Sequence, residues 1–115
     1  MDIKAYLDEL GIEIKLESQE KIAKSEKRYV FIIEIVGKKK RVYSNKIPNI
    51  DIKKAKELAI TKIKINKDDI MTIRCLEITY ANVPVETMLT QTKWEIQPIY
   101  SRWMNPEELK EISVL

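Results

Sequence analysis

The stretch Tyr29-Val30-Phe31-Ile32-Ile33-Glu34-Ile35-Val36 decides the fold of this chain. Apart from Glu34 it is apolar at every position, and it is rich in β-branched and aromatic residues. This composition is typical of a strand that is buried on both faces. We therefore expect residues 29–36 to form a central strand of a sheet.

A hairpin is predicted directly after this strand. Gly37 marks the turn, and residues 39–45 are expected to return as the hairpin partner. The alternation places Arg41 and Tyr43 on one face of the partner strand and Val42 on the other.

Three further segments carry strand patterns. Residues 12–17 alternate between apolar and charged side chains, which predicts a strand with one exposed face. Residues 18–28 are interpreted as a loop or a strand extension. Strands are also predicted over 70–80 and 94–101, and Pro98 indicates an edge position for the last of them.

Helices are predicted where capping residues precede an apolar stripe. Asp2 caps a short helix that Gly11 ends, and Asp51 begins an amphipathic helix that continues to about residue 63. Residues 105–108, Asn-Pro-Glu-Glu, have the composition of a helix start. Residues 85–89 are either a short helix or irregular.

These elements predict an α+β fold with a mixed or antiparallel sheet of about five strands and two or three helices. The expected order is α-β-β-β-α-β-β-α. A chain of 115 residues is of the size of one domain, so residues 1–115 are expected to share one core.

The composition removes several classes of site. The chain has no histidine and a single cysteine, Cys75, so it lacks the usual neutral-pH base, imidazole metal ligands and an intrachain disulfide. Two glycines cannot build a glycine-rich phosphate loop. We expect a cytoplasmic protein without an export signal or membrane span, since no apolar run approaches ~18 residues.

The charges are unevenly distributed along the chain. Residues 15–67 carry sixteen positive and six negative charges, whereas residues 68–115 carry four positive and eight negative ones. The chain thus divides into a basic part, 1–67, and an acidic, aromatic part, 68–115. A segment as basic as 15–67 can attract polyanions.

Lysines and arginine at the predicted hairpin and second helix are the candidate phosphate contacts. Their alternative role is to keep a sheet edge and a helix face solvated. The candidate nucleic-acid-binding residues are Lys38, Lys39, Lys40, Arg41, Tyr43, Lys46, Lys53, Lys56 and Lys64.

The order of elements in residues 1–64 resembles the double-stranded-RNA-binding domain. Residues 55–59, Ala-Lys-Glu-Leu-Ala, are similar to that family's A-K-x-x-A start of its second helix. The resemblance implies phosphate binding by Lys53 and Lys56, and a probe of the minor groove in the first helix.

Residues 29–63 also resemble the arm-binding domains of mobile-element integrases, which have three strands and a helix. The resemblance implies a sheet inserted in a major groove of DNA, with Arg41 and Tyr43 in contact with bases or backbone. A non-enzymatic protein that binds RNA or DNA is therefore the leading hypothesis.

The alternative hypothesis concerns the aromatic residues of the C-terminal part. Trp94, Tyr100 and Trp103 are candidates for binding a protein partner or a second copy, as in a small viral or mobile-element protein. The opposing interpretation is that these aromatics are core residues.

Motifs for chemistry are weak. Glu34 in an apolar strand could be a perturbed carboxylate, and residues 13–15 have the Glu-x-Lys spacing of metal-dependent nucleases. The pair Asp68-Asp69 lacks the further oxygen ligands of a calcium loop. We predict no catalytic residues, no metal site and no cofactor.

Overall fold

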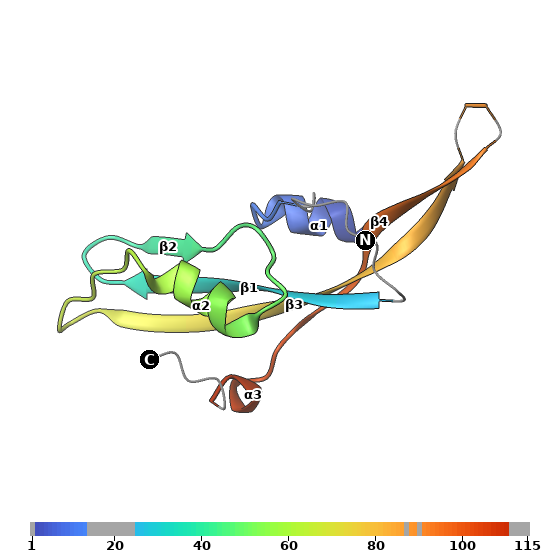
Figure 1. The fold of residues 1–115 in the computed structure, drawn as a ribbon. Coiled ribbons are helices and arrows are strands. Elements are labelled where there is room, and N and C mark those ends of the chain that lie inside the picture. Colours follow the sequence, from blue (N-terminus) through green and yellow to red (C-terminus); the bar gives the residue numbers. More distant parts are fainter. Residues whose placement is uncertain (1, 14–24, 87, 90, 111–115) are drawn as a thin grey trace.

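The computed structural model describes residues 2–13, 25–86, 88–89 and 91–110. These residues form one antiparallel four-stranded sheet with strand order β2-β1-β3-β4, together with three helices (Figure 1). The elements are α1 (Ile3–Glu9), β1 (Ser25–Val36), β2 (Arg41–Ser44), α2 (Ile52–Ile60), β3 (Ile70–Glu86), β4 (Thr92–Trp103) and α3 (Pro106–Lys110).

β1 contains the apolar stretch 29–36, and the predicted central position of this strand is confirmed. It pairs with β2 through Ile32↔Ser44 to Ile35↔Arg41, and with β3 along its whole length, from Ser25↔Ala81 to Val36↔Ile70. The edge position predicted from Pro98 is also confirmed, because among the described strands β4 pairs with β3 alone and is last in the strand order.

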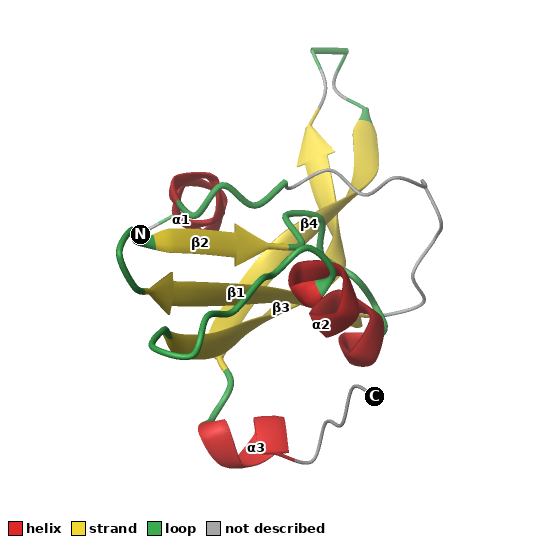
Figure 2. Ribbon diagram, turned by 90° about the vertical axis from the view of Figure 1, so that its left-hand side faces the viewer, coloured by secondary structure: helices red, strands yellow, loops and turns green. Residues whose placement is uncertain are grey.

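Each face of the sheet has its own apolar cluster. On one face Val30 and Ile32 of β1 pack with Leu7 of α1. On the other face Phe31 and Ile33 of β1 pack with residues of α2, which presents the small side chains of Ala55 and Ala59 to the sheet. The strand is apolar at consecutive positions because both of its faces are covered by helices (Figure 2).

The predicted helix starts are confirmed by their caps. The Asp2 carboxylate accepts a hydrogen bond from the backbone N–H of Lys4, at 3.1 Å, and Asp51 caps α2 in the same way. Gly11 follows α1 with φ of +73°, a left-handed conformation that favours glycine. α2 ends at Ile60, three residues before the predicted end.

Other predictions need correction. Residues 14–17 of the predicted first strand lie outside the described residues, and Ile12 and Glu13 are not in a strand, so five strands and the expected order are not confirmed. Of the segment 18–28, the described residues 25–28 belong to β1 as a strand extension. Residues 85–86, expected to be helical or irregular, continue β3, because pairing with β4 outweighs local preference.

Among the described residues, β3 and β4 extend beyond β1 as a two-stranded ribbon. β1 begins at Ser25, opposite Ala81, and β3 and β4 stay paired from Asn82↔Ile96 to Glu86↔Thr92. We call this ribbon the arm; its described residues are 82–86, 88–89 and 91–96. Near its root a register shift at Thr79/Tyr80 introduces a bulge, a feature that bends strands.

The arm makes the molecule long. The principal extents of the chain are 60 × 27 × 23 Å, and the radius of gyration of the chain is 16.4 Å, compared with ~13 Å for a compact chain of this length. The arm projects from one end of the sheet, and the β1–β2 turn lies at the opposite end (Figure 1).

Candidate nucleic-acid interface

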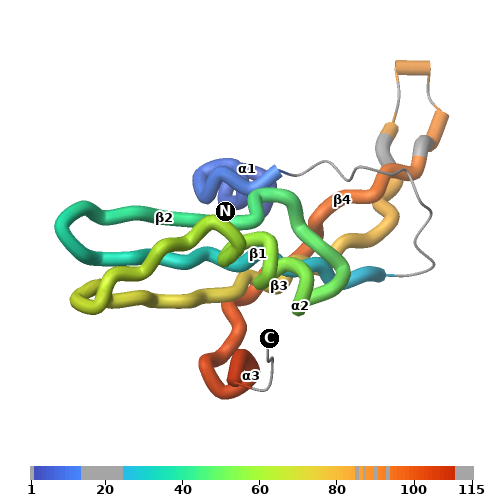
Figure 3. The backbone as a smooth tube through the Cα atoms, turned by 60° about the vertical axis from the view of Figure 1, so that its left-hand side comes forward, coloured from blue at the N-terminus to red at the C-terminus, as the bar shows by residue number. Residues whose placement is uncertain are grey.

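The β1–β2 turn and the α2–β3 connection lie side by side at the end of the sheet opposite the arm (Figure 3). Arg41 joins them, since its Nη2 donates to the Lys64 carbonyl at 3.2 Å and to Asp69 Oδ2 at 3.1 Å. The same Asp69 oxygen accepts the backbone N–H of Asn66 at 3.0 Å. We call residues 38–41 and 62–69 the basic end.

Gly37 permits the close contact between the two segments. A Cβ at this position would overlap the Asp69 carboxylate, so any other residue here would displace Asp69 or the turn. An open groove of about 600 Å³ lies at this contact. It is lined by Val36, Gly37, Lys38, Lys39, Arg41, Asn66, Asp68 and Asp69.

Most lysines of the basic end project into solvent. Lys38, Lys39 and Lys64 are exposed and form no ion pair with any described residue. Lys40 is exposed too, but its Nζ lies 3.4 Å from Glu34 Oε2. The Glu34 carboxylate is thus a half-exposed member of an ion pair rather than an isolated buried acid.

The other predicted lysines lie away from the basic end. Lys53 is exposed and Lys56 half-buried on α2. The N-terminus of α2 is already occupied, because the Asp51 carboxylate accepts the N–H groups of Lys53 and Lys54 at 2.9 and 3.4 Å. These two N–H groups are therefore not available to bind a phosphate at the start of the helix.

Tyr43 and Lys46 have different surroundings. Tyr43 is half-buried in the cluster beneath α2, so α2 covers the sheet face that it shares with Arg41. Lys46 is exposed with φ of +50°, and its carbonyl accepts the backbone N–H of Glu13 at 2.9 Å. The structure therefore brings Lys38–Arg41 together with Lys64, and it leaves Lys46, Lys53 and Lys56 outside this group.

The three aromatic candidates do not form one patch. Trp94 lies on the arm and is 65 % exposed, and Tyr100 at the arm's root is 57 % exposed. Trp103 is half-buried; its indole N–H donates to the Tyr6 hydroxyl at 2.9 Å, and its ring lies 4.4 Å from the Arg74 guanidinium. Trp103 thus attaches α1 to β4.

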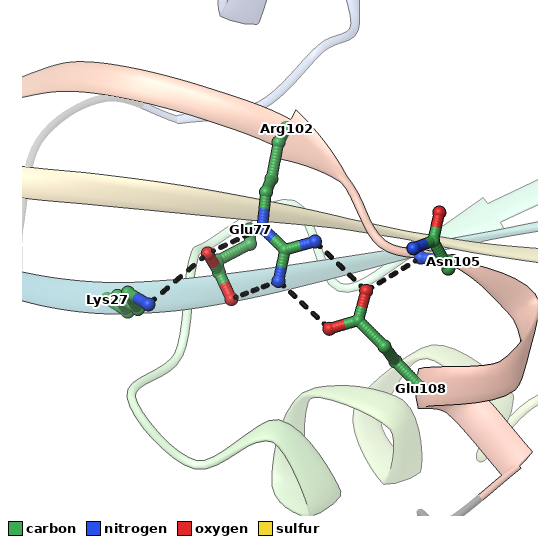
Figure 4. Close-up of polar contacts among 5 residues, drawn as sticks. All are labelled: Lys27, Glu77, Arg102, Asn105 and Glu108. Carbon is green, nitrogen blue, oxygen red and sulfur yellow. Dashed lines mark hydrogen bonds and ion pairs between the residues drawn. The ribbon is translucent and has the colours of Figure 1, made fainter.

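An ion network that the sequence analysis missed connects β3, β4 and α3 (Figure 4). Glu77 is 5 % exposed, and it accepts two hydrogen bonds from Arg102, at 3.0 and 3.3 Å. Arg102 also donates twice to Glu108, each at 2.9 Å. Lys27 Nζ lies 3.7 Å from Glu77. The only signal in the sequence was Glu77 itself, an acid among apolar residues of a strand. Glu34 has the same surroundings in the sequence, and the sequence analysis selected Glu34 instead.

The network shifts the pKa of two of its members. The hydrogen bonds from Arg102, followed by the backbone N–H of Asn105, lower the pKa of Glu108 to about 2. The bonds to Glu108 and Glu77 raise the pKa of Arg102. Both groups are fully ionised at neutral pH, so the network is a structural clamp for α3 rather than an acid–base pair.

The described residues offer little for catalysis. Burial raises the pKa of the Cys75 thiol to about 12, so the nucleophilic thiolate is suppressed. Glu13 is exposed, and its motif partners Ile14 and Lys15 lie outside the described residues. Within the described ranges no three or more Cys, Asp or Glu side chains are grouped to hold a metal ion.

Comparisons of this chain with protein-family models, curated proteins and solved structures returned no match. Among the described helices, none has the length and apolar composition needed to cross a membrane.

Proposed function

We propose that this protein is a non-enzymatic nucleic-acid-binding protein that contacts phosphates with its basic end. The proposal rests on one observation: Arg41 ties the β1–β2 turn to the α2–β3 connection. Two lysine-containing segments that are far apart in the sequence therefore lie next to each other at one end of the sheet.

The local charge favours a polyanion as the ligand. Residues 34–69 carry eleven positive and five negative charges, a net charge of +6. Phosphate neutralisation by exposed lysines releases condensed counterions, and this release supplies most of the affinity of sequence-independent binding. Lysine is a compact, flexible point charge, so contact with the backbone is expected to dominate over reading of bases.

Arg41 has a positioning role in this proposal. Its guanidinium already binds the Lys64 carbonyl and Asp69, and Asp69 is shielded from solvent. The phosphate contacts are therefore assigned to Lys38, Lys39, Lys40 and Lys64.

The first experiment is a binding titration against duplex RNA, duplex DNA and single strands at several salt concentrations. We expect affinity to fall steeply from about 50 to about 200 mM salt. The double variant Lys39→Gln/Lys64→Gln should bind more weakly, and its salt slope should be smaller by about two, one for each lysine removed.

The matched control is Lys4→Gln/Lys110→Gln, which removes the same charge from α1 and α3. If binding depends on net charge alone, both double variants lose affinity equally, and the basic end is not the interface. Affinity that does not change with salt would contradict the proposal as a whole.

A further inference from the structure

The arm exposes more apolar surface than a free hairpin can keep in water. Met88 is fully exposed, Leu89 is 78 % exposed, and Trp94 is 65 % exposed. A two-stranded ribbon is at best marginally stable in water unless another surface covers it. The arm therefore needs an apolar surface to pack against, and the arm's own chain provides one near the root.

That surface is a hollow between α1 and β4. Its volume is about 350 Å³, and it is lined by Ile3, Tyr6, Ile99, Tyr100 and Ser101. Ile99 and Tyr100 are more than half exposed. The Tyr6 side chain is held in place by the hydrogen bond from Trp103, so the hollow has a fixed wall.

We propose that two copies of this chain form a dimer in which each arm tip docks in the hollow of the other copy. The two arms lie antiparallel about a two-fold axis. An arrangement of this kind is closed, because the contact of tip with hollow occurs twice and uses up both surfaces.

The sequence positions fit this symmetry. Trp94 lies between Leu89 at the tip and Tyr100 at the hollow along the arm. When Leu89 of one copy meets Tyr100 of the other, the two-fold axis passes between these two contacts, in the part of the arm that contains Trp94. A large aromatic residue at the centre of an interface, ringed by other contacts, is typical of a binding hot spot.

The exposed apolar area is sufficient for a stable interface. Full burial removes ~150–250 Å² for an aromatic side chain and ~60–120 Å² for Leu, Ile or Met. With their exposed fractions, Met88, Leu89, Trp94, Ile99 and Tyr100 contribute about 450 Å² per copy. Since a little over half of an interface is apolar, the complete interface reaches ~800 Å² per copy, the standard size.

The charge distribution also favours a second copy in this orientation. Residues 82–101 contain one lysine and two glutamates, so two arms meet with little repulsion. The basic ends lie at the opposite ends of the two molecules, where their mutual repulsion is smallest. Extension of the sheet through the β4 edge is less favourable, because Pro98 has no N–H to donate.

The test is the molar mass in solution, by light scattering and sedimentation across the micromolar range. We expect twice the chain mass of 13.5 kDa, with dissociation on dilution. Trp94→Ala should raise the dimer dissociation constant by ~30-fold or more. Leu58→Glu is the control for a negative charge placed on an exposed residue outside the arm, in α2, and it should leave the dimer intact.

A mixture of two variants tests whether each arm tip contacts the hollow of the other copy. Leu89→Glu alters only the tip and Tyr100→Lys only the hollow, so each variant alone should be monomeric. Their mixture should dimerise, because one native contact is kept and the other becomes a Glu–Lys pair. Both positions are exposed, so circular dichroism should report an unchanged fold.

Two results would overturn the dimer. If the molar mass is that of a single chain at all concentrations, the arm does not bind a second copy, and its partner is a different protein. If the mixture of Leu89→Glu and Tyr100→Lys does not dimerise, the tip of one copy does not contact the hollow of the other. The proposal is independent of nucleic-acid binding: the Leu89→Glu monomer should keep the salt slope of the native chain in the titration described above.

Discussion

Gly37 and Asp69 meet at the basic end, where the backbone of one segment touches the side chain of another. Asp69 also accepts hydrogen bonds from Arg41 and from the Asn66 backbone. Three separate features of the basic end therefore depend on the position of one carboxylate, and the absence of a Cβ at residue 37 makes that position possible.

Gly37→Ala should destabilise the fold by ~1–3 kcal/mol in urea unfolding, the cost of an overpacked site. Gly11→Ala is the contrasting glycine variant. A Cβ at Gly11 meets open space, and the expected loss of ~1–2 kcal/mol comes from the left-handed backbone. If Asp69→Ala relieves none of the Gly37→Ala loss in a double-mutant cycle, the steric explanation is wrong.

At the element scale, α3 is held by charge more than by apolar burial. It has five residues, none of them buried, and Leu109 packs partly against the cluster beneath α2. The Arg102 bonds to Glu108 and the Asn105 N–H bond therefore decide whether this short helix stays docked on the sheet.

Glu108→Gln should reduce stability at pH 7 and remove part of the acid sensitivity of the chain. The pKa of Glu108 is about 2 in the folded protein and near 4.5 when its contacts are lost, so its contribution is complete above about pH 4.5. That contribution disappears as the pH falls towards 2, because the unfolded chain takes up the proton first.

The measurement is urea unfolding of both proteins at pH 7 and pH 3, where the difference between them should shrink. Glu107→Gln is the neighbouring control, since Glu107 is exposed and should change neither value. Arg102→Met should cost more stability than Glu108→Gln, because it leaves the buried Glu77 with Lys27 as its remaining charge partner. Equal losses of stability in Arg102→Met and Glu108→Gln would mean that Arg102 does not stabilise the buried charge of Glu77.

At the scale of the whole molecule, the two proposed surfaces lie at opposite ends of a long body. The basic end carries exposed lysines, and the arm carries the exposed Trp94 and Leu89. Figure 1 shows the arm and the basic end at opposite ends of one chain. A dimer joined through the arms would therefore present two basic ends facing away from each other, each free to contact phosphates.

Such a dimer should bridge two nucleic-acid molecules. We expect energy transfer between short duplexes with different labels when the native protein is added at low salt. The Leu89→Glu chain should bind each duplex with the same salt dependence and should not bridge them. Bridging by this monomeric variant would show that one chain holds two duplexes by itself.

The sequence by itself determined the central strand and the starts of the first two helices. The apolar run 29–36 predicts a buried strand, and the caps Asp2 and Asp51 predict two helix starts. These predictions depend on residues close together in the chain, so they could be made without knowledge of the tertiary structure. Solvent exposure of the lysines in the β1–β2 turn follows in the same way, because a polar turn has no partner to bury it.

Only the tertiary structure decided how these elements combine. The Arg41 bond to Lys64, the clamp of Arg102 on Glu77 and the hydrogen bond from Trp103 to Tyr6 join residues separated by 23, 25 and 97 positions. In the part of the chain that the structure describes, the arm consists of β3 and β4, which stay paired beyond Ala81, the partner of Ser25 at the start of β1. Local periodicity carries no information about such partners, since it records which face of an element is apolar and not what that face meets.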